Sequence, residues 1–296
     1  MAEMQKVATD GIVDYYETAM PLDMICLRYF FELIDKDGQS LYFGNYTFWE
    51  KRPKEISQMF DCPLKSKEED RFLVPDWAKG KVVYQIFPDR FAGGEKVNEK
   101  LWYDAPVKNW RAMYGGNLRG IIEKIEYIKD LGVDIVYMTP IFLSGSNHKY
   151  DTTDYFTIDP GFGTKEDLKE LVEKAHALGM YVILDGVFNH TAPDFFAFKD
   201  LKKNGETSAY KDWYYPKNFP LKSHFGQKPN YLCFGYFGGM PKLNTSNKEV
   251  QKYIYDVVTY WMKECKIDGW RLDVGDEISH SFWKWFRREI KSFKED

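Results

Sequence analysis

Apolar residues run through much of the chain in short continuous stretches, separated by segments that have the period of a helix. Four of these stretches, at 81–87, 133–140, 180–185 and 266–273, contain β-branched and aromatic residues. Short apolar runs of this kind are typical of strands buried on both faces of a parallel sheet. The pattern therefore predicts four buried strands after residue 80.

Amphipathic helices are predicted between and after these strands. Residues 164–179 begin with Thr164 and Asp167 in the spacing of a capping box, and 247–265 and 281–293 have the same helical period. The segment 117–132 has Asn117 as its expected N-cap. One face of that helix carries five apolar residues: Ile121, Ile122, Ile125, Ile128 and Leu131.

The first 76 residues have a different pattern, in which no long helical period occurs. Two apolar segments, at 24–35 and 41–49, flank the sequence DKDGQS, whose Asp-Gly pair is a hairpin turn signal. The pattern predicts a hairpin within a short, β-sandwich-like N-terminal module that covers residues 1–76.

Alternating strands and helices predict a parallel sheet covered by helices, as in a doubly wound fold or a (β/α)8 barrel. No GxGxxG or Walker pattern opens any of the helices, which argues against the nucleotide-binding, doubly wound option. A barrel needs roughly 250 residues, and about 165 are left in 77–190 and 247–296. We therefore predict an α/β fold, the first half of a TIM-type barrel, interrupted by an aromatic insertion at 191–246.

Composition narrows the class of ligand and partner. The net charge is -4 and no Lys/Arg-rich block occurs, so a nucleic-acid partner is not expected. Neither a signal peptide nor a long apolar run is present, which predicts a cytoplasmic protein without a membrane partner. Four separated cysteines suggest neither zinc nor disulfides. Aromatic residues make up 18% of the chain, a content that permits a carbohydrate ligand.

The last predicted strand places two charged side chains on one side. Arg271 and Asp273 are two residues apart, so they share a face, and Asp273 stands at the carboxyl end, where barrel active sites lie. A guanidinium beside a carboxylate favours the ionised form, which a nucleophile requires. A plain structural ion pair has the same spacing, so this pattern alone leaves both interpretations open.

Two further strand ends carry polar groups that favour the chemical interpretation. Asp185 ends the strand at 180–185 and is followed by His190, while His148 and Tyr150 follow the strand at 133–140. Taken singly, such residues are more often solvated or structural loop residues. Because carboxyl ends of parallel strands meet at one edge, we expect these groups to converge with Asp273.

Several motifs resemble those of the α-amylase superfamily of retaining glycoside hydrolases. DGVFNH at 185–190 and GWRLDVGDE at 269–277 are similar to two signatures of that family, and MPKLN at 240–244 is similar to a motif of the neopullulanase, cyclomaltodextrinase and maltogenic amylase branch. HKYDTTDYF and YQIFPDRF are also similar. Five motifs in the right order and spacing make this a specific resemblance.

The resemblance implies a role for each site residue. Asp273 would be the nucleophile, and Arg271 would hold it ionised and oriented. His148 and His190 would hydrogen-bond the sugar at the cleavage point, Tyr150 would stack on it, and Asp185 would organise Arg271. The insertion at 191–246 would be domain B, and residues 1–76 would be part of a glucan-binding, dimer-forming domain. The expected substrates are α-glucan oligosaccharides or cyclomaltodextrins, cleaved at α-1,4 bonds with retention or transferred.

The chain departs from the family pattern at two points. Retaining hydrolysis requires a second carboxyl group as acid/base, and no Glu in the expected position occurs; Glu277 is a weak surrogate. We therefore expect a catalytically incomplete chain. The loop that holds calcium in this branch is also altered in this chain. Four residues still offer oxygen donors, and they are either calcium ligands or ordinary solvated loop residues: Glu95, Asn98, Glu99 and Asn117.

Two other functions remain open at this point. The chain could be a non-catalytic α-glucan-binding fragment that uses Tyr150 and Trp102 as stacking platforms. A metal-dependent barrel hydrolase with Asp185 and His190 as ligands is a weaker alternative, because the clusters at ligand spacing that it needs are missing. Half a barrel also exposes strand edges, which makes a homodimer plausible.

Overall fold

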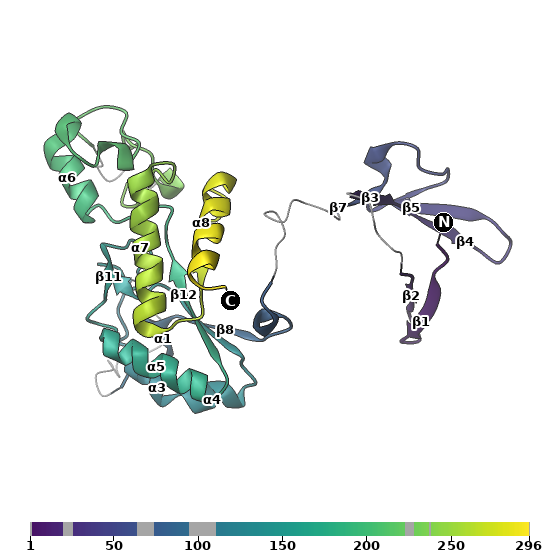
Figure 1. The fold of residues 1–296 in the computed structure, drawn as a ribbon, viewed down its shortest axis with the longest axis horizontal. Coiled ribbons are helices and arrows are strands. Elements are labelled where there is room, and N and C mark those ends of the chain that lie inside the picture. Colours follow the sequence, from purple (N-terminus) through teal and green to yellow (C-terminus); the bar gives the residue numbers. More distant parts are fainter. Residues whose placement is uncertain are drawn as a thin grey trace. The chain divides into compact units, whose positions relative to one another are not determined.

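The computed structural model describes residues 2–19, 26–63, 74–94, 111–222, 228–236 and 238–295 (Figure 1). The chain divides into two compact units, Met1–Leu73 and Val74–Asp296. Within the described ranges, no helix has both the length and the apolar character needed to cross a bilayer.

The first unit consists of short antiparallel strands. Phe31–Ile34 (β4) pairs with Ser40–Gly44 (β5). The turn between them is closed by Asp35, whose Oδ1 accepts the Gln39 N–H at 2.8 Å, so the predicted hairpin is confirmed. The other elements of this unit are β1 (Gln5–Thr9) with β2 (Asp14–Glu17), β3 (Cys26–Tyr29) with β7 (Phe60–Pro63), β6 (Thr47–Trp49) beside β5, and the 3-10 turn η1 (Ile56–Gln58).

A four-stranded parallel sheet forms the centre of the second unit. Its spatial order is β13-β12-β9-β8, so strands that follow one another in the sheet also do so along the chain. This order is that of consecutive strands in a barrel. All four predicted strands are confirmed: β8 (Val83–Ile86), β9 (Ile135–Met138), β12 (Tyr181–Gly186) and β13 (Gly269–Leu272).

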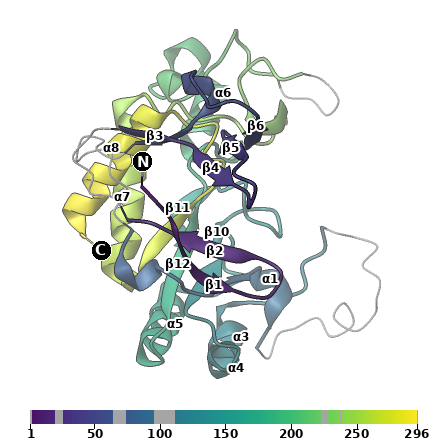
Figure 2. The same ribbon diagram turned by 90° about the vertical axis from the view of Figure 1, so that its right-hand side faces the viewer.

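Helices cover one face of this sheet. Val136, Val182 and Leu184 point to that face and are at most 1% exposed, because they belong to the cluster that includes the apolar sides of the helices. Figures 1 and 2 show α3, α4 and α5 grouped together at one end of the sheet. The helices are α3 (Leu118–Glu123), α4 (Ile125–Asp130), α5 (Lys165–Ala177), α7 (Lys248–Cys265) and α8 (His280–Phe293).

Two predicted helix caps are confirmed, and one predicted helix is interrupted. Asn117 accepts the Gly120 N–H, and Thr164 forms the expected capping box. The single helix predicted over 117–132 is wrong, because the backbone at Lys124 leaves helical dihedrals and separates α3 from α4. Since α4 ends at Asp130, Leu131 is 50% exposed and lies outside the predicted apolar face.

The segments that connect the sheet strands contain further short elements. Within 191–246 the chain forms α6 (Phe196–Asn204), a helix that the sequence pattern did not predict. Trp261 on α7 donates to the Tyr155 carbonyl at 2.8 Å, which fixes the hairpin that follows β9. The remaining elements are η3 (Asp76–Ala78), α1 (Pro88–Phe91), β10 (Phe142–Leu143), β11 (Asp154–Ile158), η4 (Gly205–Thr207), η5 (Lys211–Trp213) and η6 (Phe234–Tyr236).

Candidate active site

The face of the sheet that points away from the helices carries the charged groups. Asp185 on β12 stands opposite Arg271 on β13 in the parallel register, and Ile183 pairs with Tyr137 on β9. Side chains alternate along strands, so Tyr137, Ile183, Asp185 and Arg271 share this face. Asp273 follows β13 directly, and its N–H donates to the Gly186 carbonyl at 3.1 Å.

Arg271 lies between two carboxylates. Its Nη1 donates to Asp185 Oδ1 at 3.1 Å and to Asp273 Oδ1 at 2.5 Å. The side chains of Asp185 and Asp273 are 0% and 12% exposed, whereas that of Arg271 is 41% exposed. We call these three residues the carboxylate cluster. One cation is shared by two acids, so the cluster carries excess negative charge.

Two tyrosine hydroxyls complete the surroundings of Asp185. Both Tyr137 and Tyr150 donate to Asp185 Oδ2, the latter at 3.1 Å. Burial raises the pKa of Asp185 above its ordinary value, although the Tyr137 hydrogen bond and the Arg271 charge act in the opposite direction. Burial and the Asp185 charge raise the pKa of Tyr150 to about 12, so its hydroxyl stays protonated near neutral pH.

One oxygen of the Asp273 carboxylate has no hydrogen-bond donor within the described ranges. Arg271 holds Oδ1, and no described residue donates a hydrogen bond to Oδ2. Val274, the next residue, has a φ of 50°, which is strained for a β-branched side chain. The turn after β13 therefore holds the aspartate at the strand end through a backbone conformation that valine rarely adopts.

A buried lysine shapes the loop that delivers His148 and Tyr150. Lys149 lies between them with a φ of 62°, and its side chain is 2% exposed. Its Nζ donates to Asp159 Oδ2 at 2.7 Å and to the Ser144 carbonyl at 3.0 Å. The Tyr150 N–H donates to His148 Nδ1 at 3.2 Å, and burial lowers the pKa of His148. We infer that the imidazole is neutral, with Nε2–H available for a ligand.

The His190 side chain is buried, and both its ring and its Nε2 atom have partners inside the protein. It is 1% exposed, its ring stacks on Phe234, and its Nε2 lies 3.2 Å from the Tyr150 carbonyl. Burial lowers the pKa of His190, so the neutral ring donates from Nε2 to that carbonyl. The geometry thus joins His190 to the backbone of Tyr150, and direct binding of sugar hydroxyls by His190 stays a prediction.

Glu277 belongs to a neighbouring hydrogen-bonded group. Its Oε2 accepts from Asn189 and from Lys242, each at 3.0 Å, and Lys242 also donates to Asn189. Although burial opposes the shift, the Lys242 and Asn189 hydrogen bonds lower the pKa of Glu277. A general acid needs a raised pKa, so these partners argue against Glu277 as a surrogate acid/base.

Of the four predicted calcium ligands, only Asn117 belongs to the described residues. Glu95, Asn98 and Glu99 lie outside the described residues. Asn117 Oδ1 accepts the Gly120 N–H at 2.9 Å and its Nδ2 donates to the Gly115 carbonyl. Its oxygen therefore serves as a helix cap, and a ligand role for Asn117 stays a prediction. Within the described ranges, no three His, Cys, Asp or Glu side chains are grouped as a metal site.

The sequence reasoning missed two residues of the site. Tyr137 donates to Asp185, and Lys242 joins Asn189 to Glu277. The alternation of the strand at 133–140 could have identified Tyr137, because it occupies an inward position near the carboxyl end. Lys242 lies inside MPKLN, which was recognised as a motif without a role for its lysine. Trp102, a predicted stacking platform, lies outside the described residues.

Comparison with sequence families accounts for most of the chain. The family described as alpha amylase, catalytic domain, matches residues 85–291. The family described as alpha amylase, N-terminal ig-like domain, matches residues 1–65. Both matches agree with the motifs and with the change of pattern near residue 76.

Individual relatives agree with the family matches. A cyclomaltodextrinase from Thermoanaerobacter pseudethanolicus is 48% identical over 97% of this chain and 50% of its own length. An intracellular maltogenic amylase from Bacillus subtilis is 42% identical over 99% of this chain and 50% of its own length. A solved cyclomaltodextrinase structure has a TM-score of 0.75 and is 39% identical, and the match covers 99% of this chain and 50% of that structure's chain. The chain spans about half the length of these relatives.

Proposed function

The chain belongs to the α-amylase family, as an N-terminal Ig-like module followed by the first half of a catalytic (β/α)8 barrel with its domain B insertion, and on this premise we propose that it supplies the nucleophile-bearing half of a retaining α-glucan hydrolase. The substrates are α-1,4-linked glucans or cyclomaltodextrins, with transfer to an acceptor sugar as a second outcome. The names of the cyclomaltodextrinase and maltogenic amylase relatives support this class.

One observation carries the proposal: a single guanidinium group spans the carboxylates of Asp185 and Asp273 at the ends of adjacent strands. The fully buried Asp185 carboxylate by itself balances the Arg271 charge. The second carboxylate, with an oxygen to which no described residue donates, is the group a covalent mechanism needs.

Asp273 acts as the nucleophile in the proposed reaction. Its Oδ2 forms a bond to the anomeric carbon while the glycosidic C–O bond breaks, which gives a glycosyl ester with inverted configuration. Water or an acceptor hydroxyl then displaces the carboxylate with a second inversion. Arg271 keeps the carboxylate oriented through Oδ1, because that oxygen remains hydrogen-bonded during the attack.

The leaving-group oxygen must receive a proton, and the described residues offer no suitable donor. The carboxyl oxygens of Asp185 accept from Tyr137, Tyr150 and Arg271. Glu277 has a lowered pKa. We therefore assign the acid/base to neither Asp185 nor Glu277, and we expect this chain alone to turn over cyclomaltodextrin very slowly or not at all.

The other predicted site residues surround the reacting sugar in this proposal. Tyr150 and His148 lie next to each other with ring centroids 5.9 Å apart, and Tyr150 also contacts Asp185. We assign stacking on the sugar ring to Tyr150 and hydrogen bonding to its hydroxyls to His148. His190 acts through Tyr150, whose carbonyl it holds, and its contact with sugar requires that this bond be exchanged.

A substrate that needs no acid catalyst tests the proposal. In 5-fluoro-α-D-glucosyl fluoride the C–F bond breaks without protonation, so the nucleophile alone can form the ester while fluoride leaves with the electron pair. We expect the 296-residue chain to gain the mass of one 5-fluoroglucosyl group, located by peptide mass spectrometry at Asp273.

Two substitutions in one peptide provide matched controls. Asp273→Asn should abolish the label, whereas Asp276→Asn, at an exposed acid three residues away, should keep it. A chain that binds maltoheptaose without ever being labelled would support the non-catalytic glucan-binding alternative. Rapid release of reducing sugar from cyclomaltodextrin by this chain, lost in Asp273→Asn, would overturn the expectation that this chain alone turns over cyclomaltodextrin very slowly or not at all.

We also propose a cytoplasmic homodimer, as a separate matter from the chemistry. The name of the intracellular relative supports the location. Exposed apolar side chains on β1, β2 and the turn between them support self-association: Val7, Ile12, Val13, Tyr15 and Tyr16 are each at least 49% exposed. Light scattering of the chain and of a Tyr16→Lys variant tests the dimer, which the substitution should weaken.

Calcium binding remains a proposal for the loop that contains Glu95, Asn98 and Glu99. The family resemblance is its support, and no step of the reaction depends on it. Thermal unfolding in the presence of calcium chloride and of a chelator tests it, since an ion that binds only the folded state raises the melting temperature.

A further inference from the structure

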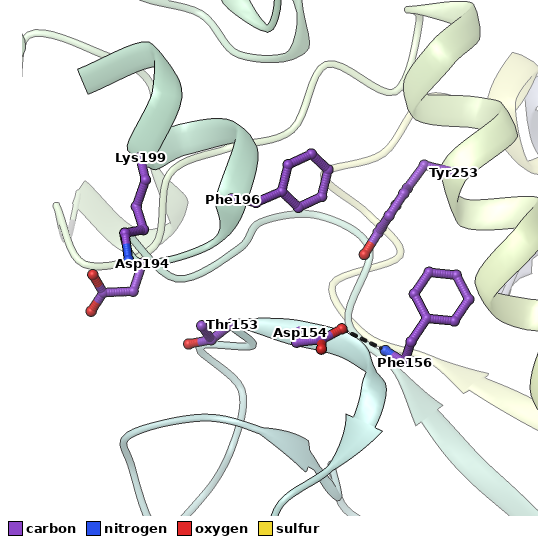
Figure 3. A pocket seen from close by; sticks show the side chains of 7 residues that line it. All are labelled: Thr153, Asp154, Phe156, Asp194, Phe196, Lys199 and Tyr253. Carbon is purple, nitrogen blue, oxygen red and sulfur yellow. Dashed lines mark hydrogen bonds between the residues drawn. The ribbon is translucent and has the colours of Figure 1, made fainter. Parts of the chain in front are cut away.

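A pocket of about 540 Å³ lies beside β11, α6 and α7 (Figure 3). Tyr155 on β11 points away from it, because the Tyr155 hydroxyl donates to the carbonyls of Val187 and His190. Since neighbours on a strand point to opposite faces, Asp154 and Phe156 point into the pocket. We call it the ring pocket and define it by its lining: Thr153, Asp154, Phe156, Asp194, Phe196, Lys199 and Tyr253.

Three aromatic rings form one side of the ring pocket. Tyr253 contacts Phe156 and Phe196, with ring centroids 5.7 and 5.8 Å apart. Phe156 and Phe196 are 36% and 45% exposed, so their faces are accessible to a ligand from solvent. Exposed rings grouped around a hollow are typical of recognition of an apolar molecular face.

Polar groups form the opposite side. Asp194 lies just before α6 and Lys199 lies within it. Both are exposed, and neither side chain has an ion-pair or hydrogen-bond partner among the described residues. Figure 3 shows Asp194 and Lys199 at the left, Tyr253 and Phe156 at the right, and Phe196, Thr153 and Asp154 in the middle of the view. The pocket thus combines ring faces with the Asp194 carboxylate and the Lys199 ammonium group, whereas both Asp154 oxygens already accept hydrogen bonds from Phe156 and Thr157.

We propose that the ring pocket binds a segment of an α-glucan chain at a second site, apart from the carboxylate cluster. A glucose ring has an apolar face of C–H groups that fits an aromatic ring, and hydroxyls around its edge that fit the carboxylates and the ammonium. The pocket is open to solvent, so a polymer can pass through it and continue on either side. The inference rests on the proposed function only for the chemical class of the ligand.

The consequence is retention of long glucans near the strand ends. A short substrate occupies only one site, whereas a long chain can occupy both and gains affinity through the second contact. The ring pocket should therefore matter for glycogen and maltoheptaose, and it should not affect reaction of a single sugar unit at Asp273.

Affinity electrophoresis of the 296-residue chain in gels that contain glycogen tests the proposal, with maltoheptaose as competitor. We expect wild-type chain to be retarded. Phe196→Ala should weaken the binding roughly tenfold, as loss of an aromatic anchor does. Phe196→Trp should retain it, because the larger ring preserves the stacking face.

Matched variants separate binding from folding. Phe293 is 42% exposed at the end of α8 and does not line the ring pocket, so Phe293→Ala should leave glycogen binding unchanged. Asp194→Asn and Lys199→Gln remove side chains that have no partner among the described residues, so they should weaken binding without changing the melting temperature. Labelling at Asp273 by the glycosyl fluoride should be equal in all of these variants.

The outcomes distinguish this inference from the proposed function. Weaker glycogen binding in the pocket variants alone supports the ring pocket, even where Asp273 is never labelled. Absence of retardation in the wild type, or equal retardation in all variants, would overturn it. A change of oligomeric mass in Phe196→Ala, seen by light scattering, would also overturn it, since the pocket would then be covered by a second copy.

Discussion

Among the ion pairs of the second unit, those of Lys149 and of Arg271 differ in how completely they are closed. Lys149 is 2% exposed and pairs with one carboxylate, that of Asp159. The Arg271 side chain is 41% exposed and serves two carboxylates, those of Asp185 and Asp273. Each group of the closed pair has its partner inside the protein, whereas the open cluster has a carboxylate oxygen to which no described residue donates.

The difference separates a structural role from a chemical one. A buried pair with matched charges holds a loop in place, because breaking it would leave an uncompensated charge out of water. The second carboxylate beside Arg271 gives the open cluster an excess negative charge, which a matched structural pair does not have and which is typical of a reactive site. The two clusters are also connected, since Lys149 lies between His148 and Tyr150, and Tyr150 donates to Asp185.

The largest expected effect comes from breaking the closed pair. Lys149→Met removes the partner of the Asp159 carboxylate and of the Ser144 carbonyl, so we expect the free energy of unfolding to fall by about 3–5 kcal/mol. Urea denaturation followed by tryptophan fluorescence measures this loss.

An exposed pair provides the control for that substitution. Lys174 and Glu170 on α5 are 3.2 Å apart with side chains 51% and 38% exposed, so Lys174→Met should cost about 0–0.5 kcal/mol. Equal losses in Lys149→Met and Lys174→Met would show that burial does not separate the two kinds of pair, and the comparison above would be wrong.

Breaking the open cluster should affect chemistry more than stability. Arg271→Met leaves Asp185 with its two tyrosine donors, and burial already raises the pKa of Asp185, so this acid can take up a proton. We expect a loss of about 1–3 kcal/mol in the free energy of unfolding, together with loss of the label at Asp273. Denaturation and mass spectrometry measure the two effects.

Arg271→Lys sharpens this prediction. Lysine keeps the positive charge but presents it as a point, whereas the guanidinium bonds two carboxylates from one planar group. The variant should therefore retain most of the stability and still lose most of the labelling rate. A variant with full labelling would indicate that charge alone, without orientation, is sufficient at Asp273.

Acid should lower the free energy of unfolding through His148 and His190, which lie near the two clusters. Burial lowers the pKa of both His148 and His190 in the folded chain, whereas in the unfolded chain the value is near 6.5. The unfolded state therefore binds protons first as the pH falls below 6.5. Stability that is present above this pH is lost below it, by at most about 1.4 kcal/mol per pH unit for each histidine.

Replacement of the histidines measures that contribution. The difference in stability between pH 7 and pH 5.5 should become smaller in His190→Gln, and smaller again when His148→Gln is added. An unchanged pH dependence in the double variant would mean that these rings do not remain neutral in the folded protein.

The regular parts of the fold could be predicted from the sequence, because local pattern and tertiary packing agree there. Strands such as Tyr181–Gly186 are apolar on the helix-covered face, and Thr164 and Asp167 cap α5 with the spacing that the sequence predicts. The break at Lys124 and the helix α6 were missed, since lysine is an ordinary helix former and α6 begins after Phe195 without a side-chain cap.

The sequence predicted which residues form the site better than it predicted their hydrogen-bond partners. Alternation along strands placed Asp185, Arg271 and Asp273 on one face, and the structure brings them within hydrogen-bonding distance. The partners of His190 and the pairing of Lys149 with Asp159 depend on loop conformations, including a positive φ at Lys149, that no periodic pattern encodes. The roles of these residues in binding and reaction stay predictions.

The smallest expected effect distinguishes the two tyrosines that meet at Asp185. Tyr137 is 7% exposed and Tyr150 is partly exposed, yet both donate to the same oxygen. Tyr137→Phe should lower the free energy of unfolding by about 0.5–1.5 kcal/mol, and Tyr150→Phe by less, because water can replace the more accessible donor. Denaturation of both single variants and of the double variant measures the coupling. A double variant that loses more than the sum of the single losses would indicate that one hydroxyl suffices to hold the Asp185 carboxylate. Equal single losses would contradict the expectation that water replaces the Tyr150 hydroxyl more easily than the buried Tyr137 hydroxyl.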